Sequence, residues 1–251
     1  MFPISDDNPT FNRPYATYFL FGLNIAAWLL LQGAGFGTQL DSSVCSYGLI
    51  PSELFGGAQI GVCDTRNNLG TLSVISSMFM HGSWMHIAGN MLFLWVFGDN
   101  VEDVMGPIKF IVFYLLGGIT AAAFQVFSDP SSSIPMVGAS GAIGAVMGGY
   151  LLLYPKARIK MFIFIFIFFT TFRVPAFVML GYWIAVQMIS AVSVQSATGG
   201  VAFWAHIGGF AFGAITIHLF KDKQMIVSHP EYGWNKNTNP ADIWKDPQNR
   251  K

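Results

Sequence analysis

The sequence is poor in charge. Its 251 residues include 13 Lys and Arg and 13 Asp and Glu, so charged residues make up 10% of the chain, whereas soluble domains usually carry about 25%. Six stretches contain no Asp, Glu, Lys or Arg: residues 15–31, 83–98, 110–127, 140–154, 175–193 and 201–219. Because about 20 apolar residues cross a hydrocarbon core, this pattern predicts a polytopic membrane protein. It argues against a soluble core, which would need polar faces at regular intervals.

Cysteines and basic clusters are also scarce. The chain has only Cys45 and Cys63, both between the first and second uncharged stretches. They can form a disulfide if that segment faces an oxidising compartment, and two free thiols are the alternative. Without a basic patch, no nucleic-acid partner is expected. The acidic start MFPISDDNPTFNRP is unlike a cleavable signal peptide, so the first stretch is expected to remain in the protein.

The uncharged stretches predict an all-α integral membrane protein with six helices. The expected helices cover residues 15–31, 83–101, 108–127, 136–154, 175–193 and 201–220. Three regions follow: a short cytoplasmic N-terminus over 1–14, a six-helix domain over 15–220, and a polar cytoplasmic tail over 221–251. The loop of about fifty residues after the first helix is too long for a simple turn, and SVQSATGG is expected to form the last loop.

The region Met161–Val194 is too long for one membrane helix and short for two. It carries Arg173 and Pro175 near its middle. Its first part, MFIFIFIFFTTF, is β-branched and aromatic, which predicts an extended or re-entrant segment on the cytoplasmic side. Pro175 is then expected to begin the fifth helix, since proline is tolerated at a helix start.

The positions of Lys and Arg predict the orientation. With an N-terminus inside, the outer loops receive only Arg66. The inner side receives Arg13, Lys109, Lys156, Arg158, Lys160, Lys221 and Lys223. Positive charge in short loops favours the cytoplasmic side, so both termini are expected there, with an even number of crossings.

A few polar residues lie inside the uncharged stretches, where they are costly and mark candidate functional sites. The second helix opens with HGSWMHIAGN, which places His86 and Asn90 one turn apart and His81 before them. The fourth opens with GASG and carries Ser140. The sixth opens with GGVAFWAHIGG and carries His206.

These polar residues are expected to converge. In a six-helix topology the second, fourth and sixth helices run in the same direction, and each polar residue lies near the helix start, at a common depth of roughly 5–10 Å. Small residues three or four apart let helices approach closely. Such glycines line the fourth and sixth helices: Gly138, Gly141, Gly144, Gly148, Gly209 and Gly213. Ser140 is therefore expected within hydrogen-bonding distance of His206, near the outer membrane surface.

The chemistry that fits this set is nucleophilic catalysis. A neutral serine needs a base, and His206 is the candidate. None of the six stretches contains an acid, so a Ser-His dyad is predicted rather than a triad, which also avoids burying a carboxylate. Backbone N–H groups around Ser140, the Asn90 amide and the His86 imidazole can stabilise an oxyanion.

Each feature has a structural alternative. A serine in a Gly-rich helix often only packs, and a membrane histidine is often structural. A zinc site formed by the three histidines would lack an HExxH motif and any cysteine or carboxylate ligand, so no metal or organic cofactor is expected. The acids after the second helix are expected in a solvated loop and helix start: Asp99, Glu102 and Asp103.

The three motifs together resemble the rhomboid family of intramembrane serine proteases. GASG with Ser140, AHIGG with His206, and HGSWMHIAGNMLFLW with His81, His86 and Asn90 match the three signature helices of that family, in family order. The resemblance covers residues 76–219. It implies that a short fourth helix presents Ser140 to a water-filled cavity, with His206 as base, and that His86 and Asn90 hold the oxyanion.

The resemblance also implies the partners. Single-pass transmembrane proteins would be cleaved near the outer surface, in contact with membrane lipid, with residues 33–80 partly in the membrane and the fifth helix gating entry. Two positions depart from the family pattern. Leu72 and Ser73 stand where many members have Trp-Arg, and Gly144 stands where some have a Tyr that stacks on the base. Either another aromatic residue orients His206, with Trp204 as the candidate, or none does.

Two other functional classes fit parts of the pattern. A non-catalytic binder of membrane helices needs neither Ser140 nor His206. A small transporter would be expected to show intramembrane charges or inverted repeats, and the sequence has no internal repeat. The short N-terminus favours a bacterial cytoplasmic membrane, with an organelle membrane as the alternative.

Overall fold

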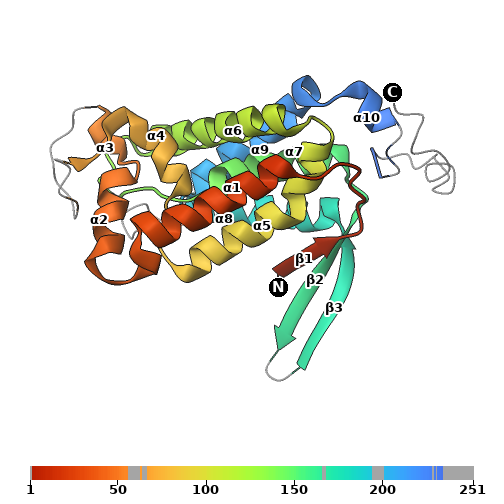
Figure 1. Ribbon diagram of the computed structural model, residues 1–251, viewed down its shortest axis with the longest axis horizontal. Coiled ribbons are helices and arrows are strands. Elements are labelled where there is room, and N and C mark those ends of the chain that lie inside the picture. The colour runs from red at the N-terminus through yellow and green to blue at the C-terminus, as the bar shows by residue number, and fades with distance from the viewer. Residues whose placement is uncertain are drawn as a thin grey trace.

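The computed structural model describes residues 2–55, 63, 67–165, 168–193, 201–227, 229 and 231–233. Outside these residues lie Arg66, most of the tail predicted over 221–251, and residues 194–200 of the predicted loop SVQSATGG, whose first residue, Ser193, ends a helix. The fold is mostly helical, as predicted. The long helices run side by side, with three short helices at one end of the bundle, α2 (Gly37–Tyr47), α3 (Pro51–Leu54) and α4 (Ser73–Ser76), and a small β-sheet near the other end (Figure 1).

The long helices match the uncharged stretches. Their bounds are Tyr15–Ala26 (α1, continued by a π-helical turn Ala27–Leu31), Trp84–Asp103 (α5), Pro107–Ser128 (α6), Ser140–Leu153 (α7), Ala176–Ser193 (α8) and Phe203–Phe220 (α9). Among the described residues, α6, α8 and α9 are long and apolar enough to cross a membrane by length and composition. A short helix, α10, follows at Lys223–Val227.

The fourth helix is shorter than predicted. It was expected to begin at Met136, but α7 begins at Ser140, because Met136 is held in an extended bridge with Leu49. The two residues exchange backbone hydrogen bonds of 2.9 and 2.7 Å. Gly138 then adopts a φ of +129°, a conformation that glycine tolerates and a side chain does not. Ser140 is therefore the first residue of its helix.

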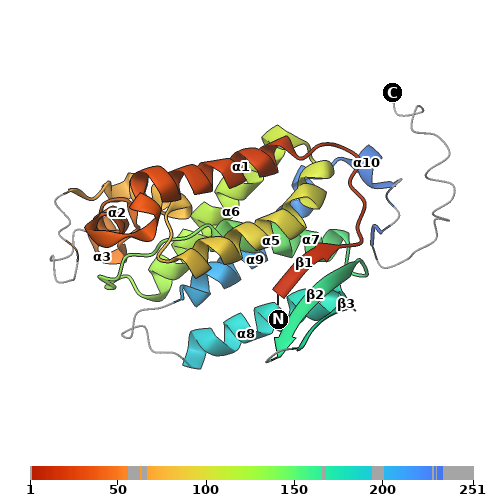
Figure 2. The ribbon, with the colours of Figure 1, turned by 60° about the horizontal axis from the view of Figure 1, so that its bottom comes forward.

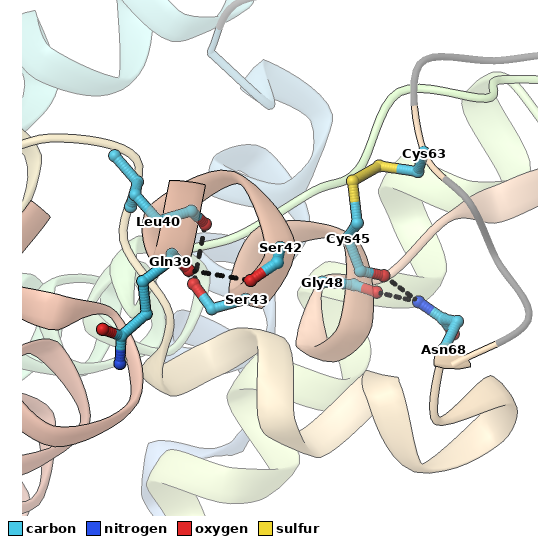
Figure 3. Close-up of a disulfide and its surroundings, with 8 residues drawn as sticks. All are labelled: Gln39, Leu40, Ser42, Ser43, Cys45, Gly48, Cys63 and Asn68. Carbon is cyan, nitrogen blue, oxygen red and sulfur yellow. Dashed lines mark hydrogen bonds between the residues drawn. A yellow bond between two sulfur atoms is a disulfide. The ribbon is translucent and has the colours of Figure 1, made fainter. Parts of the chain in front are cut away.

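The long loop after α1 is built from short helices. They are α2 (Gly37–Tyr47), α3 (Pro51–Leu54) and α4 (Ser73–Ser76). A disulfide joins Cys45 at the end of α2 to Cys63 (Figure 3), which decides between the two alternatives left open by the sequence. Nearby, the Asn68 amide donates to the carbonyls of Cys45 and Gly48 at 2.7 and 3.0 Å, so the returning chain is fastened to the same turn.

The aromatic segment before the fifth helix is extended, which confirms that part of the prediction. It forms a hairpin of β2 (Arg158–Ile165) and β3 (Phe168–Pro175). Strand β1 (Phe2–Asp6) pairs antiparallel with β2, and the sheet order is β1-β2-β3. The sheet lies beside the bundle, close to one end of α8 (Figure 2).

The predicted location of the acids after the second helix is wrong. Helix α5 continues to Asp103, and Glu102 and Asp103 are buried, with 2% and 4% exposure. The Glu102 carboxylate accepts from the backbone N–H groups of Ala16 and Thr17 at 2.9 and 2.7 Å, where α1 begins. These N–H groups have no partner within the helix, so the acid replaces a helix cap.

Asp6 is expected to make the stability of the protein depend on pH. Partial burial raises the pKa of its carboxyl group from 3.8 to about 7, although the Tyr150 hydroxyl donates a hydrogen bond to it. Since the unfolded chain loses this proton at lower pH than the native protein, stability is expected to fall as pH rises from about 4 to about 7. Asp6→Asn is expected to remove this part of the slope in thermal unfolding in detergent. Asp41→Asn, at an exposed residue of α2, is the control and is expected to keep the wild-type dependence of stability on pH. The same dependence in Asp6→Asn as in wild type would contradict the expectation.

Candidate active site

Ser140 is presented by a tightly held turn at the start of α7. The Gly138 N–H donates to the Ser77 carbonyl at 2.9 Å, which fixes the turn against the end of the long loop. A Cβ at Gly138 would lie 2.6 Å from the His86 Nε2 atom, so glycine is needed for space as well as for its φ angle. As the first residues of a helix, Ser140 and Gly141 have N–H groups without intrahelical partners.

His206 approaches Ser140 from α9. Its Nε2 atom lies 2.8 Å from the Ser140 Oγ atom, and the imidazole is 8% exposed. The contact depends on the close packing of α7 on α9: a Cβ at Gly209 would lie 2.0 Å from the Gly141 carbonyl oxygen, and one at Gly213 would lie 1.8 Å from the Ala145 carbonyl oxygen. The glycine spacing had predicted such an approach.

His86 and Asn90 reach the same place from α5. Ser83 caps this helix by accepting from the His86 N–H at 3.1 Å. The Gly82 N–H donates to His86 Nδ1 at 3.3 Å, so the proton of a neutral imidazole lies on Nε2, toward Gly138. Asn90 is 7% exposed, and its Nδ2 atom has no hydrogen-bond partner among the described residues. Two N–H donors therefore stand free beside Ser140.

His81 supports this arrangement from behind. It is fully buried, and its ring packs edge-on against His86 with centroids 5.1 Å apart. Gln32 holds its backbone on both sides: the Gln32 amide donates to the His81 carbonyl, and the His81 N–H donates back to Gln32, each at 2.7 Å. The structure thus gives His81 a packing contact with His86 and no contact with Ser140.

A cavity of about 660 Å³ opens in front of these groups. Its lining includes Ser140, His206, His86 and Asn90, so the four predicted residues share one space. The lining also contains apolar side chains, among them Met85, Phe93 and Trp204. A nucleophile with a base, two free donors and an apolar wall can hold a carbonyl compound and stabilise negative charge on its oxygen.

The prediction that Trp204 orients His206 is wrong. The ring beside His206 belongs to Trp183 of α8, with centroids 5.6 Å apart and planes 38° from parallel. Gln187, one turn further along α8, places its Oε1 atom 2.8 Å from His206 Nδ1. Neither contact was predicted from the sequence. A tryptophan and a glutamine within an apolar stretch do not indicate which face of the helix packs against its neighbour.

Comparison with known proteins places this site in a family. The Rhomboid domain matches residues 69–223, more than half of the chain, and includes all four residues at the cavity. The chain belongs to the rhomboid family. This confirms the resemblance seen in the three motifs. Together with the apolar helices, the rhomboid domain makes the chain an integral membrane protein.

Three rhomboid relatives show the extent of the likeness. The chain is 29% identical over 153 residues to "Rhomboid protein 1, mitochondrial" of Saccharomyces cerevisiae, which covers 57% of this chain and 40% of the relative. It is 27% identical over 147 residues to "Presenilin-associated rhomboid-like protein A, mitochondrial" of Danio rerio, a match that covers 57% of this chain and 36% of the relative. It is 29% identical over 160 residues to "RHOMBOID-like protein 12, mitochondrial" of Arabidopsis thaliana, a match that covers 57% of this chain and 44% of the relative. The chain therefore spans less than half the length of these relatives. Their names give no support to the predicted bacterial cytoplasmic membrane.

Proposed function

We propose that this protein is an intramembrane serine endopeptidase in which Ser140 is the nucleophile and His206 the general base. The observation that carries the proposal is the 2.8 Å contact between Ser140 Oγ and His206 Nε2 inside a cavity that His86 and Asn90 also line. The Asn90 Nδ2 atom has no hydrogen-bond partner among the described residues. A hydroxyl that only packed would not need an imidazole nitrogen at this distance. Membership of the rhomboid family supports the same reaction.

The proposed reaction proceeds in two stages. Ser140 Oγ attacks the scissile carbonyl while His206 Nε2 takes the hydroxyl proton, and negative charge develops on the carbonyl oxygen. His86 Nε2–H, Asn90 Nδ2–H and the first N–H groups of α7 stabilise that charge. His206 then gives its proton to the departing amine, which leaves an acyl-enzyme at Ser140. Water, activated by the same imidazole, hydrolyses the acyl-enzyme and restores Ser140.

The topology proposed for this reaction has six membrane helices and both termini on the cytoplasmic side. They are α1, α5, α6, α7, α8 and α9, within residues 15–220. Disulfides persist in oxidising compartments, so the Cys45–Cys63 bond supports placing the long loop on the outer side. The starts of α5 and α7 lie at that end of the bundle, so the site would cut single-pass transmembrane substrates near the outer surface.

Covalent labelling tests the proposed nucleophile. The purified chain in mild detergent is treated with a fluorophosphonate, and the adduct is located by peptide mass spectrometry. We expect the adduct on Ser140 alone, because among the described residues only this serine hydroxyl is hydrogen-bonded to an imidazole. A folded chain that takes up no label, or takes it up on another serine, would contradict the proposal and favour a non-catalytic binder of membrane helices.

Asn90→Ala is expected to lower kcat by about 100- to 1,000-fold, as the loss of one oxyanion donor does in other serine enzymes. The measurement is steady-state cleavage of a transmembrane peptide in detergent. KM is expected to change little, since the donor acts mainly when charge develops in the transition state. A variant that raised KM and kept kcat would instead assign Asn90 to substrate binding.

A further inference from the structure

Helix α8 has few buried side chains, and the last of them along the chain is polar. Over its described length it buries only Ala176, Met179, Leu180 and Gln187. After Leu180, Gln187 is therefore the one buried residue of this helix, with 8% exposure. The apolar residues that follow it, Met188 and Ile189, are 52% and 64% exposed. Figure 2 shows α8 at the rim of the bundle. Since polar groups in membranes are costly unless paired, Gln187 requires a specific partner.

That partner is the imidazole of His206. The Gln187 Oε1 atom, 2.8 Å from His206 Nδ1, is an amide oxygen and can only accept a hydrogen bond. His206 Nδ1 must therefore carry the proton of the neutral imidazole. The other nitrogen, Nε2, is then unprotonated and presents its lone pair to the Ser140 hydroxyl. The amide selects the one tautomer in which His206 can act as a base.

The same helix also fixes the plane of the ring. Trp183 lies four residues before Gln187, so both side chains project from one face of α8 toward His206. The Trp183 ring lies beside the imidazole, with centroids 5.6 Å apart. The hydrogen bond to Gln187 fixes how the imidazole is turned within its own plane, and the Trp183 ring limits how far the imidazole plane can tilt.

An amide suits this position better than a carboxylate. In serine proteases with a triad, an aspartate orients the histidine, and wrong tautomer selection there costs about 10⁴-fold in kcat. A carboxylate at Gln187 would have to be buried between apolar helices, at a large cost in desolvation. A neutral oxygen acceptor fixes the same tautomer without that charge.

We propose that Gln187 is a positioning residue that completes a Ser140–His206–Gln187 array by holding His206 in its Nδ1-protonated tautomer. This inference rests on the proposed function of Ser140 and His206. It assigns to α8 a part in catalysis: the base is correctly oriented only while α8 is seated against α9.

The test uses the labelling kinetics of the full chain with a fluorophosphonate, which separate the maximal rate, kinact, from the binding constant, KI. Gln187→Leu is expected to lower kinact by about 100-fold or more, because general acid–base catalysis contributes about 10²- to 10⁴-fold, with KI little changed. Gln187→Glu keeps an oxygen acceptor at the same reach, so it is expected to retain more of the rate than Gln187→Leu does. It is expected to stay below wild type, because a carboxylate costs desolvation in this buried position. Met188→Leu, on the adjacent exposed position, is the matched control and should label as wild type does.

A second measurement does not depend on the folding of any Gln187 variant. ¹⁵N NMR of the histidine-labelled chain, with His206→Ala to assign the signal, reports which ring nitrogen of His206 is protonated. We expect the Nδ1-protonated tautomer. The Nε2-protonated form, or wild-type kinact in folded Gln187→Leu, would overturn the inference while leaving Ser140 labelling intact. If Ser140 in the wild type takes up no label, the proposed function fails first and the inference with it.

Discussion

Alanine at Ser140 or at His206 is expected to lower the rate of substrate cleavage by about 10⁴-fold or more, as loss of a nucleophile or base does in serine proteases. Ser140 supplies the attacking oxygen, and His206 is the only imidazole within 2.8 Å of it among the described residues. Because the two groups act as one unit, the double variant should be no slower than either single variant. The measurement is cleavage of a single-pass transmembrane protein reconstituted with the enzyme.

Two exposed positions provide matched controls. Ser131→Ala changes a serine in the loop before α7, and His218→Ala changes a histidine at the far end of α9. Both are expected to cleave at the wild-type rate. Equal cleavage by Ser140→Ala and wild type would remove Ser140 from the reaction. Losses that add up in the double variant would show that Ser140 and His206 act independently.

Gly209→Ala is expected to destabilise the protein by about 3 kcal/mol or more, at the upper end for overpacked cores. The added Cβ would lie 2.0 Å from the Gly141 carbonyl oxygen, a backbone atom that cannot move without shifting α7. Activity should fall as well, because the displaced helix carries Ser140. Thermal unfolding in detergent measures the first effect and fluorophosphonate labelling the second.

Gly22→Ala is the control for this substitution. It lies in α1, where no atom is found within 4 Å of a built Cβ. Alanine is a better helix former than glycine by about 1 kcal/mol, so this variant is expected to be as stable as wild type or slightly more stable. If Gly209→Ala unfolded at the wild-type temperature, α7 and α9 could not be as close as described.

The sequence predicted the site better than its surroundings. Ser140, His206, His86 and Asn90 could be brought together because helix direction and depth follow from the number of crossings and the distance from each helix start. Neither depends on how a helix is rotated about its axis. Gln187 and Trp183 could not be found in this way. Their role depends on which face α8 turns to α9, and an almost uniformly apolar helix does not encode that face in its pattern.

The errors in the fold have a related cause. Glu102 and Asp103 were expected in solvent because acids usually are, yet the Glu102 carboxylate bonds to N–H groups of residues 16 and 17, and Asp103 accepts from the N–H groups of Phe11 and Asn12. These partners lie more than 80 positions away along the chain. Whether a carboxylate is buried depends on hydrogen-bond donors this far away along the chain. The residues that neighbour an acid in the sequence do not indicate whether such donors exist.

Strand β1 has a consequence for the order of synthesis. Phe2 pairs with Phe162, on a hairpin that follows four of the long helices. At about 5–20 residues per second, the first strand leaves the ribosome roughly 10–30 s before its partner. During that time its backbone groups have no strand to pair with, while α1, α5, α6 and α7 are made. The sheet can therefore close only late in synthesis, after the first four long helices have been made.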